Sequence, residues 1–213
     1  MVPRGQRRIA ASSVVWCALA AAALYGQGDF RQATWGMSRS QVTAAETGTP
    51  AAVRENNGEV IVQYGPLRLG ALDCRLLYIF ARDKLVRAKY VFEAAHSDRN
   101  DFIADYHAIE PLLAEQHGKA ASARAIWEDD STQDEPKSYL DQDRATPSSI
   151  LPSDRFVGLA VSLGHLRLYT EWATGRSKIL HALTGEDGQI THQIEYRSVA
   201  LEALENEVRQ TRR

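Results

Sequence analysis

The feature that most constrains the fold is a pair of alternating segments that each turn back on themselves. Residues 74–94 alternate apolar and polar side chains on both sides of a polar turn at residues 82–84. Residues 177–197 do the same around a turn at residues 185–188 that has glycine at both ends. A period of two is typical of strands with one buried face, and short polar turns connect antiparallel neighbours. The two segments therefore predict two β-hairpins.

Further segments add strands and helices around these hairpins. Shorter alternating runs predict four more strands, at residues 60–64, 67–72, 124–128 and 165–172. Helical spacing and capping residues predict three helices: one that begins after Ser38 and stops at Gly48, one over residues 98–117, and one that begins after Ser198. Pro111 predicts a kink or an early end in the second helix, because proline removes a donor and crowds the preceding turn. Residues 156–163 fit a helix and a strand equally well.

The order of these elements predicts the α+β class. Each hairpin is followed by a serine that can cap a helix, Ser97 in one case and Ser198 in the other. We therefore expect an antiparallel sheet with helices packed on one face, built as a tandem of two helix-plus-sheet halves that suggests a duplication. Parity along the first hairpin assigns one shared face, the expected core side, to Leu77, Ile79, Val86, Ala88, Tyr90 and Phe92.

An uncharged segment near the N-terminus predicts export. Three arginines within the first eight residues precede residues 9–26, which carry no charge and include a run of alanines. This composition is typical of a signal peptide over residues 1–26, with small-residue cleavage positions around residues 20–23. The same segment is just long enough to act as an uncleaved signal anchor. We expect a periplasmic protein or, alternatively, one anchored in the inner membrane by residues 9–26.

Export changes the interpretation of the two cysteines. Cys17 lies in the signal segment, and Trp16 immediately before it does not fit a lipidation signal. Cleavage would leave Cys74, in a strand-like run, without an intramolecular partner. We expect Cys74 to be a buried small side chain rather than a reactive thiol.

Composition divides the exported part of the chain into three segments. A first half over residues 29–118 and a second half over residues 155–213 flank a linker or loop at residues 119–154. Within it, residues 129–154 hold seven acidic residues against two basic ones, together with three prolines. Such a composition is typical of a solvated segment, and its acids lack the spacing of an EF-hand calcium loop.

Charge and motifs exclude several classes of function. The chain has 25 Lys and Arg against 27 Asp and Glu, a net charge of -2, which is not the basic footprint of a nucleic-acid-binding protein. It contains no nucleophile elbow, no zinc-protease helix motif and no phosphate-binding glycine loop. We therefore expect a protein that is not an enzyme, uses no cofactor, binds no nucleic acid, and contacts a membrane only through a retained signal anchor.

Two histidines of the second hairpin are candidates for a metal or pH-sensitive pair. A four-residue turn at residues 185–188 would pair Thr184 with Gln189 and place His181 directly opposite His192. A zinc site needs further ligands, whereas the neighbouring side chains on that face are aliphatic. We favour a structural or pH-sensitive pair, and metal binding is the weaker alternative.

The second sheet face is a candidate surface for a partner. It combines aromatic and basic side chains, which are enriched in protein interfaces. The alternative is that its aromatic side chains pack beneath the helices as core. The candidate partner-binding residues are Tyr78, Phe80, Arg87, Lys89, Arg167 and Tyr169.

The segment around the first helix contains a motif that begins at Trp35. Its defining residues are Gly36, Met37, Ser38, Gln41, Val42, Gly48 and Pro50. This pattern resembles the opening motif of the BamE/SmpA/OmlA family of bacterial envelope proteins, and the likeness covers about residues 35–94. A tandem pair of such units resembles the architecture of the β-lactamase inhibitor protein. The local interpretation of the same residues is a capped helix start with Trp35 packed beneath it.

The resemblance implies a function of a particular kind. Such modules are small exported binding or scaffold proteins, so it implies an envelope protein as partner and no catalysis. The alternative function is a periplasmic small-ligand binder or hydrolase with a cleft between the two halves.

Overall fold

The first half of the chain supplies four strands that pair in sequence as antiparallel neighbours. The computed structural model describes residues 28–128 and 157–211. The strands of the first half are β1 (Ala52–Asn56), β2 (Glu59–Leu69), β3 (Leu72–Ala81) and β4 (Lys84–Phe92). Both predicted strands of the first hairpin are present, as β3 and β4.

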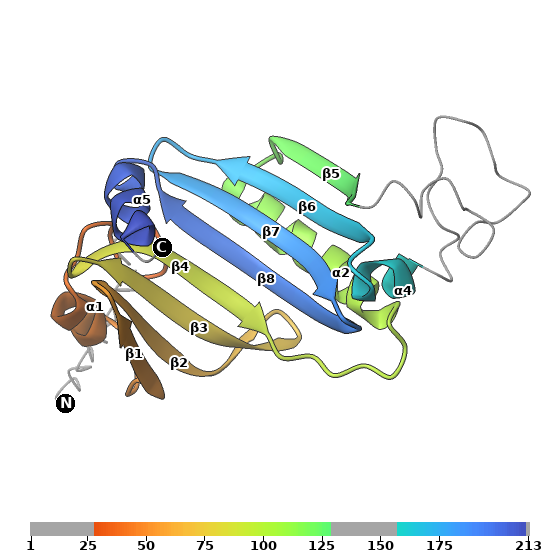
Figure 1. Ribbon diagram of the computed structural model, residues 1–213, viewed down its shortest axis with the longest axis horizontal. Coiled ribbons are helices and arrows are strands. Elements are labelled where there is room, and N and C mark those ends of the chain that lie inside the picture. The colour runs from red at the N-terminus through yellow and green to blue at the C-terminus, as the bar shows by residue number, and fades with distance from the viewer. Residues whose placement is uncertain (1–27, 129–156, 212–213) are drawn as a thin grey trace, which may run out of the picture.

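The second half repeats this arrangement and completes one continuous sheet (Figure 1). Its strands are β5 (Ser122–Trp127), β6 (Leu166–Ala173), β7 (Ser177–Glu186) and β8 (Gln189–Ser198). The order across the sheet is β1-β2-β3-β4-β8-β7-β6-β5, so each half runs from an edge to the centre in chain order. The last strands of the two halves, β4 and β8, join them as an antiparallel pair. The α+β class with an antiparallel sheet is therefore confirmed.

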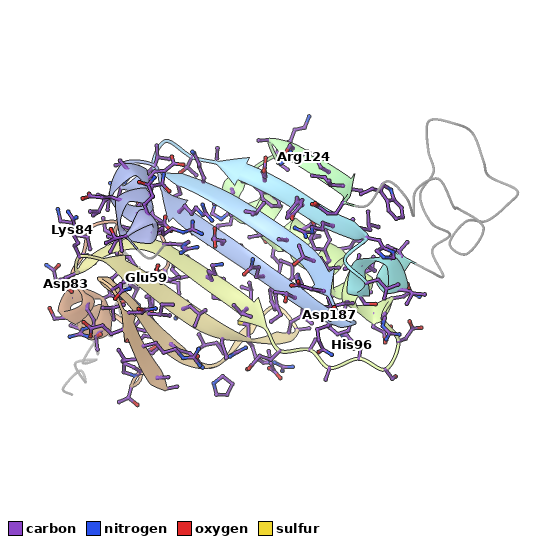
Figure 2. The ribbon with its side chains drawn as sticks, viewed as in Figure 1. Glu59, Asp83, Lys84, His96, Arg124 and Asp187 are labelled. Carbon is purple, nitrogen blue, oxygen red and sulfur yellow. The ribbon has the colours of Figure 1, made fainter. Side chains whose placement is uncertain are left out.

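The antiparallel β4–β8 pair places the two predicted hairpin turns at opposite ends of the sheet. Asp83 lies in the β3–β4 turn at one end, and Asp187 lies in the β7–β8 turn at the other (Figure 2). Both turns have two central residues with positive φ, which is the geometry that matches the twist of a hairpin.

Four helices of the described residues pack against the sheet. They are α1 (Arg39–Ala45), α2 (Asp101–His117), α4 (Val157–Ser162) and α5 (Glu202–Gln210). The α2 helix continues through Pro111 and ends at Gly118, whose φ of 78° is easy for glycine. Residues 157–162 form a helix, which decides between the two structures that the sequence allowed.

The helices cover the two faces of the sheet unequally (Figure 1). On one face, the apolar side chains of α1, α2 and the segment before α1 form the largest core cluster with side chains such as Tyr78 and Ile194. The α4 helix adds a second cluster on that face, around Leu183. On the opposite face, α5 packs at one end over a smaller cluster that includes Ile79 and Val86.

The edge of the first half differs from the sequence prediction. The strand β1 was not predicted, although Asn57-Gly58 forms its two-residue turn with β2. The strands expected at residues 60–64 and 67–72 are one strand, β2, with a shift in register between Tyr64 and Leu67. The interruption is Gly65-Pro66, and proline fits there because a bulge does not need its missing N–H donor.

A second bulge reverses part of the face assignment in the first hairpin. Ile79 pairs with Arg87 and Phe80 pairs with Leu85, so Val86 is an extra residue in β4. One extra residue exchanges the faces of every position beyond it. The prediction of one shared face was wrong, and its members divide into Leu77, Ile79 and Val86 on the side of α5, and Ala88, Tyr90 and Phe92 on the side of α2.

The structure also differs from the sequence prediction in where the segments of the chain begin and end. The strand β5 lies within the range 119–154 that was predicted as a linker, and it pairs with β6 at the edge of the sheet. The most acidic part of that range, residues 129–154, and the predicted signal segment 1–26 lie outside the described residues. Within the described residues, none of the helices has the length and apolar character needed to cross a bilayer.

Candidate functional site

The sheet face that carries α5 is the candidate binding surface, and we call it the open face. The only described helix that packs on it is α5, at one end. Alternation places one set of half-buried side chains on this face, away from the core beneath α2. These side chains are Arg75, Leu77, Lys89, Gln193, Leu180, Tyr169 and Arg167.

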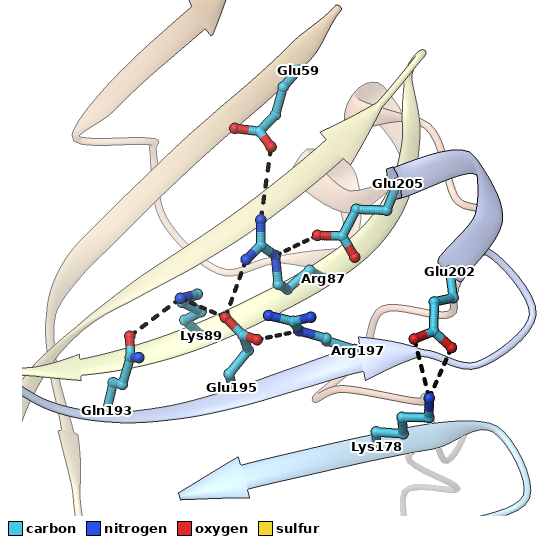
Figure 3. A network of polar contacts seen from close by, with 9 residues as sticks. All are labelled: Glu59, Arg87, Lys89, Lys178, Gln193, Glu195, Arg197, Glu202 and Glu205. Atoms are coloured by element: carbon cyan, nitrogen blue, oxygen red, sulfur yellow. Dashed lines mark hydrogen bonds and ion pairs between the residues drawn. The ribbon is translucent and has the colours of Figure 1, made fainter. Parts of the chain in front are cut away.

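Arg87 is the centre of a buried ionic network between the open face and α5 (Figure 3). Its side chain is 10% exposed and forms ion pairs with Glu205 of α5 at 2.9 Å, Glu195 of β8 at 3.2 Å and Glu59 of β2 at 3.7 Å. Each of these carboxylates is at most 5% exposed. One guanidinium thus connects the two halves of the sheet and holds the final helix against them.

Glu195 extends this network along the open face. Besides Arg87, it pairs with Lys89 at 2.5 Å and with Arg197 two residues further along β8. Burial alone would raise the pKa of the Glu195 carboxyl, but the charges of Lys89 and Arg87 outweigh it and lower that pKa to about 2. The stability that this carboxylate contributes is therefore complete above its ordinary pKa of 4.5 and is lost as the pH falls toward 2.

The network is balanced in charge. Its three cations, Arg87, Lys89 and Arg197, face three carboxylates, and Lys89 also donates to the amide oxygen of Gln193 at 3.2 Å. At the edge of α5, Lys178 pairs with Glu202 at 2.8 Å. These contacts immobilise long side chains on the open face, so the surface is organised before any partner binds.

The predicted partner-binding residues do not all reach this surface. Tyr78 and Phe80 are completely buried on the opposite face, because the bulge at Val86 separates them from Arg87 and Lys89. For these two residues the interpretation as a surface patch was wrong, and the alternative of core packing holds. The other four candidates, Arg87, Lys89, Arg167 and Tyr169, lie on the open face, with Arg87 buried in the network.

At the outer end of the open face, a second set of ion pairs lies on β5 and β6. Arg167 approaches Glu128 at 3.5 Å, and Arg124 pairs with Glu171 at 2.6 Å. These groups are about 40% to 50% exposed, so their pairing contributes little to folding stability and leaves them accessible. Tyr169 lies between them and is half-buried.

His181 and His192 are brought together, but not in the predicted register. The β7–β8 turn has two residues rather than four, so His181 pairs with Ile194, and His192 is its diagonal neighbour. Their Nε2 atoms are 2.8 Å apart, and burial lowers the pKa of both rings. One neutral ring therefore donates to the other, which is a hydrogen bond and not a metal-binding arrangement. No cluster of three or more metal-ligating side chains occurs among the described residues.

Two further polar groups on the side of α2 were not anticipated from the sequence. His96 lies 2.7 Å from Asp105, and the Thr170 hydroxyl donates to Glu110 at 2.8 Å while it accepts from Tyr106. The Thr170 hydroxyl is buried beneath α2, where a substrate could not reach it. Cys74 is also buried, as predicted, and burial raises the pKa of its thiol to about 11. Neither the Thr170 hydroxyl nor the Cys74 thiol is therefore activated for nucleophilic attack.

The motif at the start of the first half has a structural role that accounts for its residues. Ser38 and Gln41 form a reciprocal capping box on α1, and Val42 is buried beneath it. Gly36, with a φ of 86°, donates to the Leu85 carbonyl at 2.9 Å and so fixes this segment to β4. Trp35 does not only pack beneath the helix, because its indole N–H donates to the Ser177 hydroxyl of β7 at 2.9 Å.

The remaining motif residues complete the same connection. Met37 accepts through its carbonyl from the Leu85 N–H at 2.8 Å, and its sulfur accepts from the Thr34 N–H. Gly48 has a φ of 94° in the turn that leads through Pro50 to β1. The motif thus attaches α1 to both halves of the sheet. No family model matches this chain, and no curated protein or solved structure is significantly similar to it.

Proposed function

We propose that this chain is an exported, non-enzymatic interaction or scaffold module of the bacterial cell envelope that binds a protein partner on the open face. The observation that carries the proposal is the open face itself. It is a broad sheet surface that α5 covers only at one end, and its accessible part combines Tyr169 with arginine, lysine and glutamine side chains. Tyrosine and arginine are enriched in protein interfaces.

The ionic network supports this proposal because it restricts the side chains that would meet a partner. Lys89 and Gln193 are held by hydrogen bonds and ion pairs, so binding would cost little side-chain entropy. The balanced charges favour a partner that offers hydrogen-bonding groups of both kinds, and they do not favour a polyanion such as nucleic acid.

The location in the envelope rests on the sequence. Residues 1–26 have the composition of a signal segment, and the motif at residues 35–50 resembles that of the BamE/SmpA/OmlA family. Fractionation of cells that express the full chain tests this part. We expect the protein in the periplasmic or inner-membrane fraction, and a protein found only in the cytoplasm would contradict the proposal.

A pair of matched variants tests the open face. The variant Arg167→Glu/Tyr169→Ala changes accessible residues on it, whereas Glu115→Ala/Lys119→Ala changes exposed residues near the end of α2. Each tagged protein is cross-linked and purified from envelopes of its native host. We expect a protein that co-purifies with wild type and with the α2 variant but not with the open-face variant. Identical co-purification with both variants would contradict a partner on this face.

A further inference from the structure

A cavity that is partly open to solvent lies at the junction between the two halves, on the face opposite to the open face. Its volume is about 610 Å³, within the range of small-molecule binding sites. The first half contributes the segment before α1 and part of β4, and the second half contributes β7, β8 and the β6–β7 turn. The last two turns of α2 and Leu69 at the end of β2 complete the lining. The cavity is therefore separate from the surface to which we assign the protein partner.

The floor of the cavity is aromatic and aliphatic. Tyr90 of β4 and Tyr196 of β8 lie on either side of the junction, and Phe30 packs against both rings at centroid distances of 5.1 and 4.8 Å. Leu113 and Leu112 of α2 line the opposite side, and Leu112 is 38% exposed at the opening. Such a floor favours a ligand with a flat or flexible apolar part, because that part displaces water from apolar surface when it binds.

Arg31 supplies a charged group to the lining of the cavity. Its side chain is 33% exposed, whereas its partner Glu46 is only 3% exposed and is not part of the lining. Glu46 accepts from the guanidinium at 2.8 Å and also from the Tyr78 hydroxyl at 2.8 Å. Glu46 thus holds the guanidinium through two donors, Nε and a terminal nitrogen, and the Tyr90 side chain forms a further hydrogen bond with it. The part of the Arg31 side chain that stays exposed lines the cavity.

A second ion pair lines the cavity, and its cation is again the more exposed partner. Arg176 is 65% exposed, and its partner Asp29 is 8% exposed and also accepts from the backbone N–H of Trp35. The ionised groups of the lining are therefore two arginines and one aspartate, and the arginines are the accessible ones. The other polar side chains of the lining are those of Gln116, His117, Thr174 and Ser177. The His117 ring lies 3.0 Å from the Tyr196 hydroxyl, and burial lowers the pKa of this ring.

We propose that this cavity binds a small amphipathic anion, with a carboxylate beside Arg31 and an apolar body against Tyr90, Tyr196 and Leu113. A partly exposed guanidinium whose own carboxylate is buried is suited to recognise a second, planar carboxylate by hydrogen bonding. The aromatic floor supplies the area for the apolar body. This site is independent of the proposed protein partner, since it lies on the other face of the sheet.

Three probes with the same ten-carbon chain test the chemistry of the head group. Decanoate, decanol and decyltrimethylammonium, each below its micelle concentration, are titrated into the purified full chain by calorimetry. We expect saturable binding of one decanoate per chain, at least about tenfold tighter than decanol, because a charge-assisted hydrogen bond is stronger than a neutral one. Equal affinities for the three probes, tighter binding of the cation, or no binding of decanoate would overturn the proposal.

Variants locate the site. Leu112→Trp places a larger side chain at a partly exposed position in the lining, and we expect it to abolish decanoate binding. The matched control is Glu115→Trp, one turn further along the exposed side of α2, which should bind decanoate as wild type does. Arg31→Gln should reduce decanoate affinity to that of decanol and leave decanol unchanged. Decanoate binding that survives Leu112→Trp would place the ligand elsewhere and refute the assignment, even if Arg31→Gln fails to fold.

Discussion

The Nε2 atoms of His181 and His192 lie 2.8 Å apart in the core beneath α2, and each ring is stacked on an aromatic neighbour. Tyr106 covers His181 at a centroid distance of 4.0 Å, and Phe92 covers His192 at 4.1 Å. The Nδ1 atoms of both rings are buried without a hydrogen-bond partner among the described residues. The pair is therefore held neutral in a place where a proton would be costly.

This arrangement makes folding sensitive to mild acid. Because burial lowers the pKa of both rings, the unfolded chain binds protons first as the pH falls below 6.5, and stability is lost there. Each histidine should contribute about 1.4 kcal/mol of this loss per pH unit. Urea unfolding between pH 7.5 and 5 should show a steep loss in wild type that His181→Leu/His192→Leu largely removes. The variant His107→Gln, which changes an exposed histidine, serves as the control. If the double variant keeps the wild-type dependence of unfolding free energy on pH, the buried pair is not the source of the acid sensitivity.

Removal of Arg87 should be among the most damaging single substitutions. Arg87→Met leaves three nearly buried carboxylates without their shared cation, which costs about 3–5 kcal/mol. The exposed pair Arg82–Glu207 provides a control, because Arg82→Met should cost less than about 1 kcal/mol. Chemical denaturation of both variants measures the difference. Similar losses for the two would show that the network does not hold α5 and the two halves together.

The capping box predicts a smaller, local effect. Ser38→Ala removes the side chain that accepts from the Gln41 N–H, and it should destabilise the protein by about 1 kcal/mol. The neighbouring variant Arg39→Ala keeps the box and should change the unfolding free energy by less than half of that amount. The expectation fails if both variants have the same midpoint of denaturation.

Two glycines of the second half should differ sharply in their tolerance of alanine. A Cβ atom on Gly185 would lie 1.9 Å from the Val161 carbonyl oxygen of α4, so Gly185→Ala must displace that helix or β7. At Gly175 no atom lies within 4 Å of the new methyl group, and φ is not positive, so Gly175→Ala should be nearly neutral. Thermal unfolding of the two variants, compared with wild type, checks this contrast.

The sequence predicted local structure well where chemistry acts over a few residues. The alternation of residues 74–94 and 177–197 identified both hairpins, and Ser38 with Gln41 identified the start of α1. The Asn57-Gly58 pair is a strong hairpin signal that would have revealed β1. These features depend on backbone preferences that the residues themselves carry.

The parts that were missed depend on contacts between distant segments. The extra residue of the bulge, Val86, packs against α5, a helix more than 100 residues later, and no local pattern predicts the bulge. Arg87 and Glu195 meet only because β4 pairs with β8, so the network could not be assembled from sequence separation. The two-residue turn at Asp187-Gly188 moved His181 out of direct opposition to His192, although the pair still met.

Site-specific photo-cross-linking tests the binding role of the open face most directly. A photoreactive side chain is introduced at Tyr169 on the open face or at Glu115 on the exposed side of α2, in the full chain expressed in its native host. The proposed role requires a discrete cross-linked protein from position 169 that is absent from position 115. Cross-linking at 115 alone, or at neither position while the protein remains folded and exported, would contradict it.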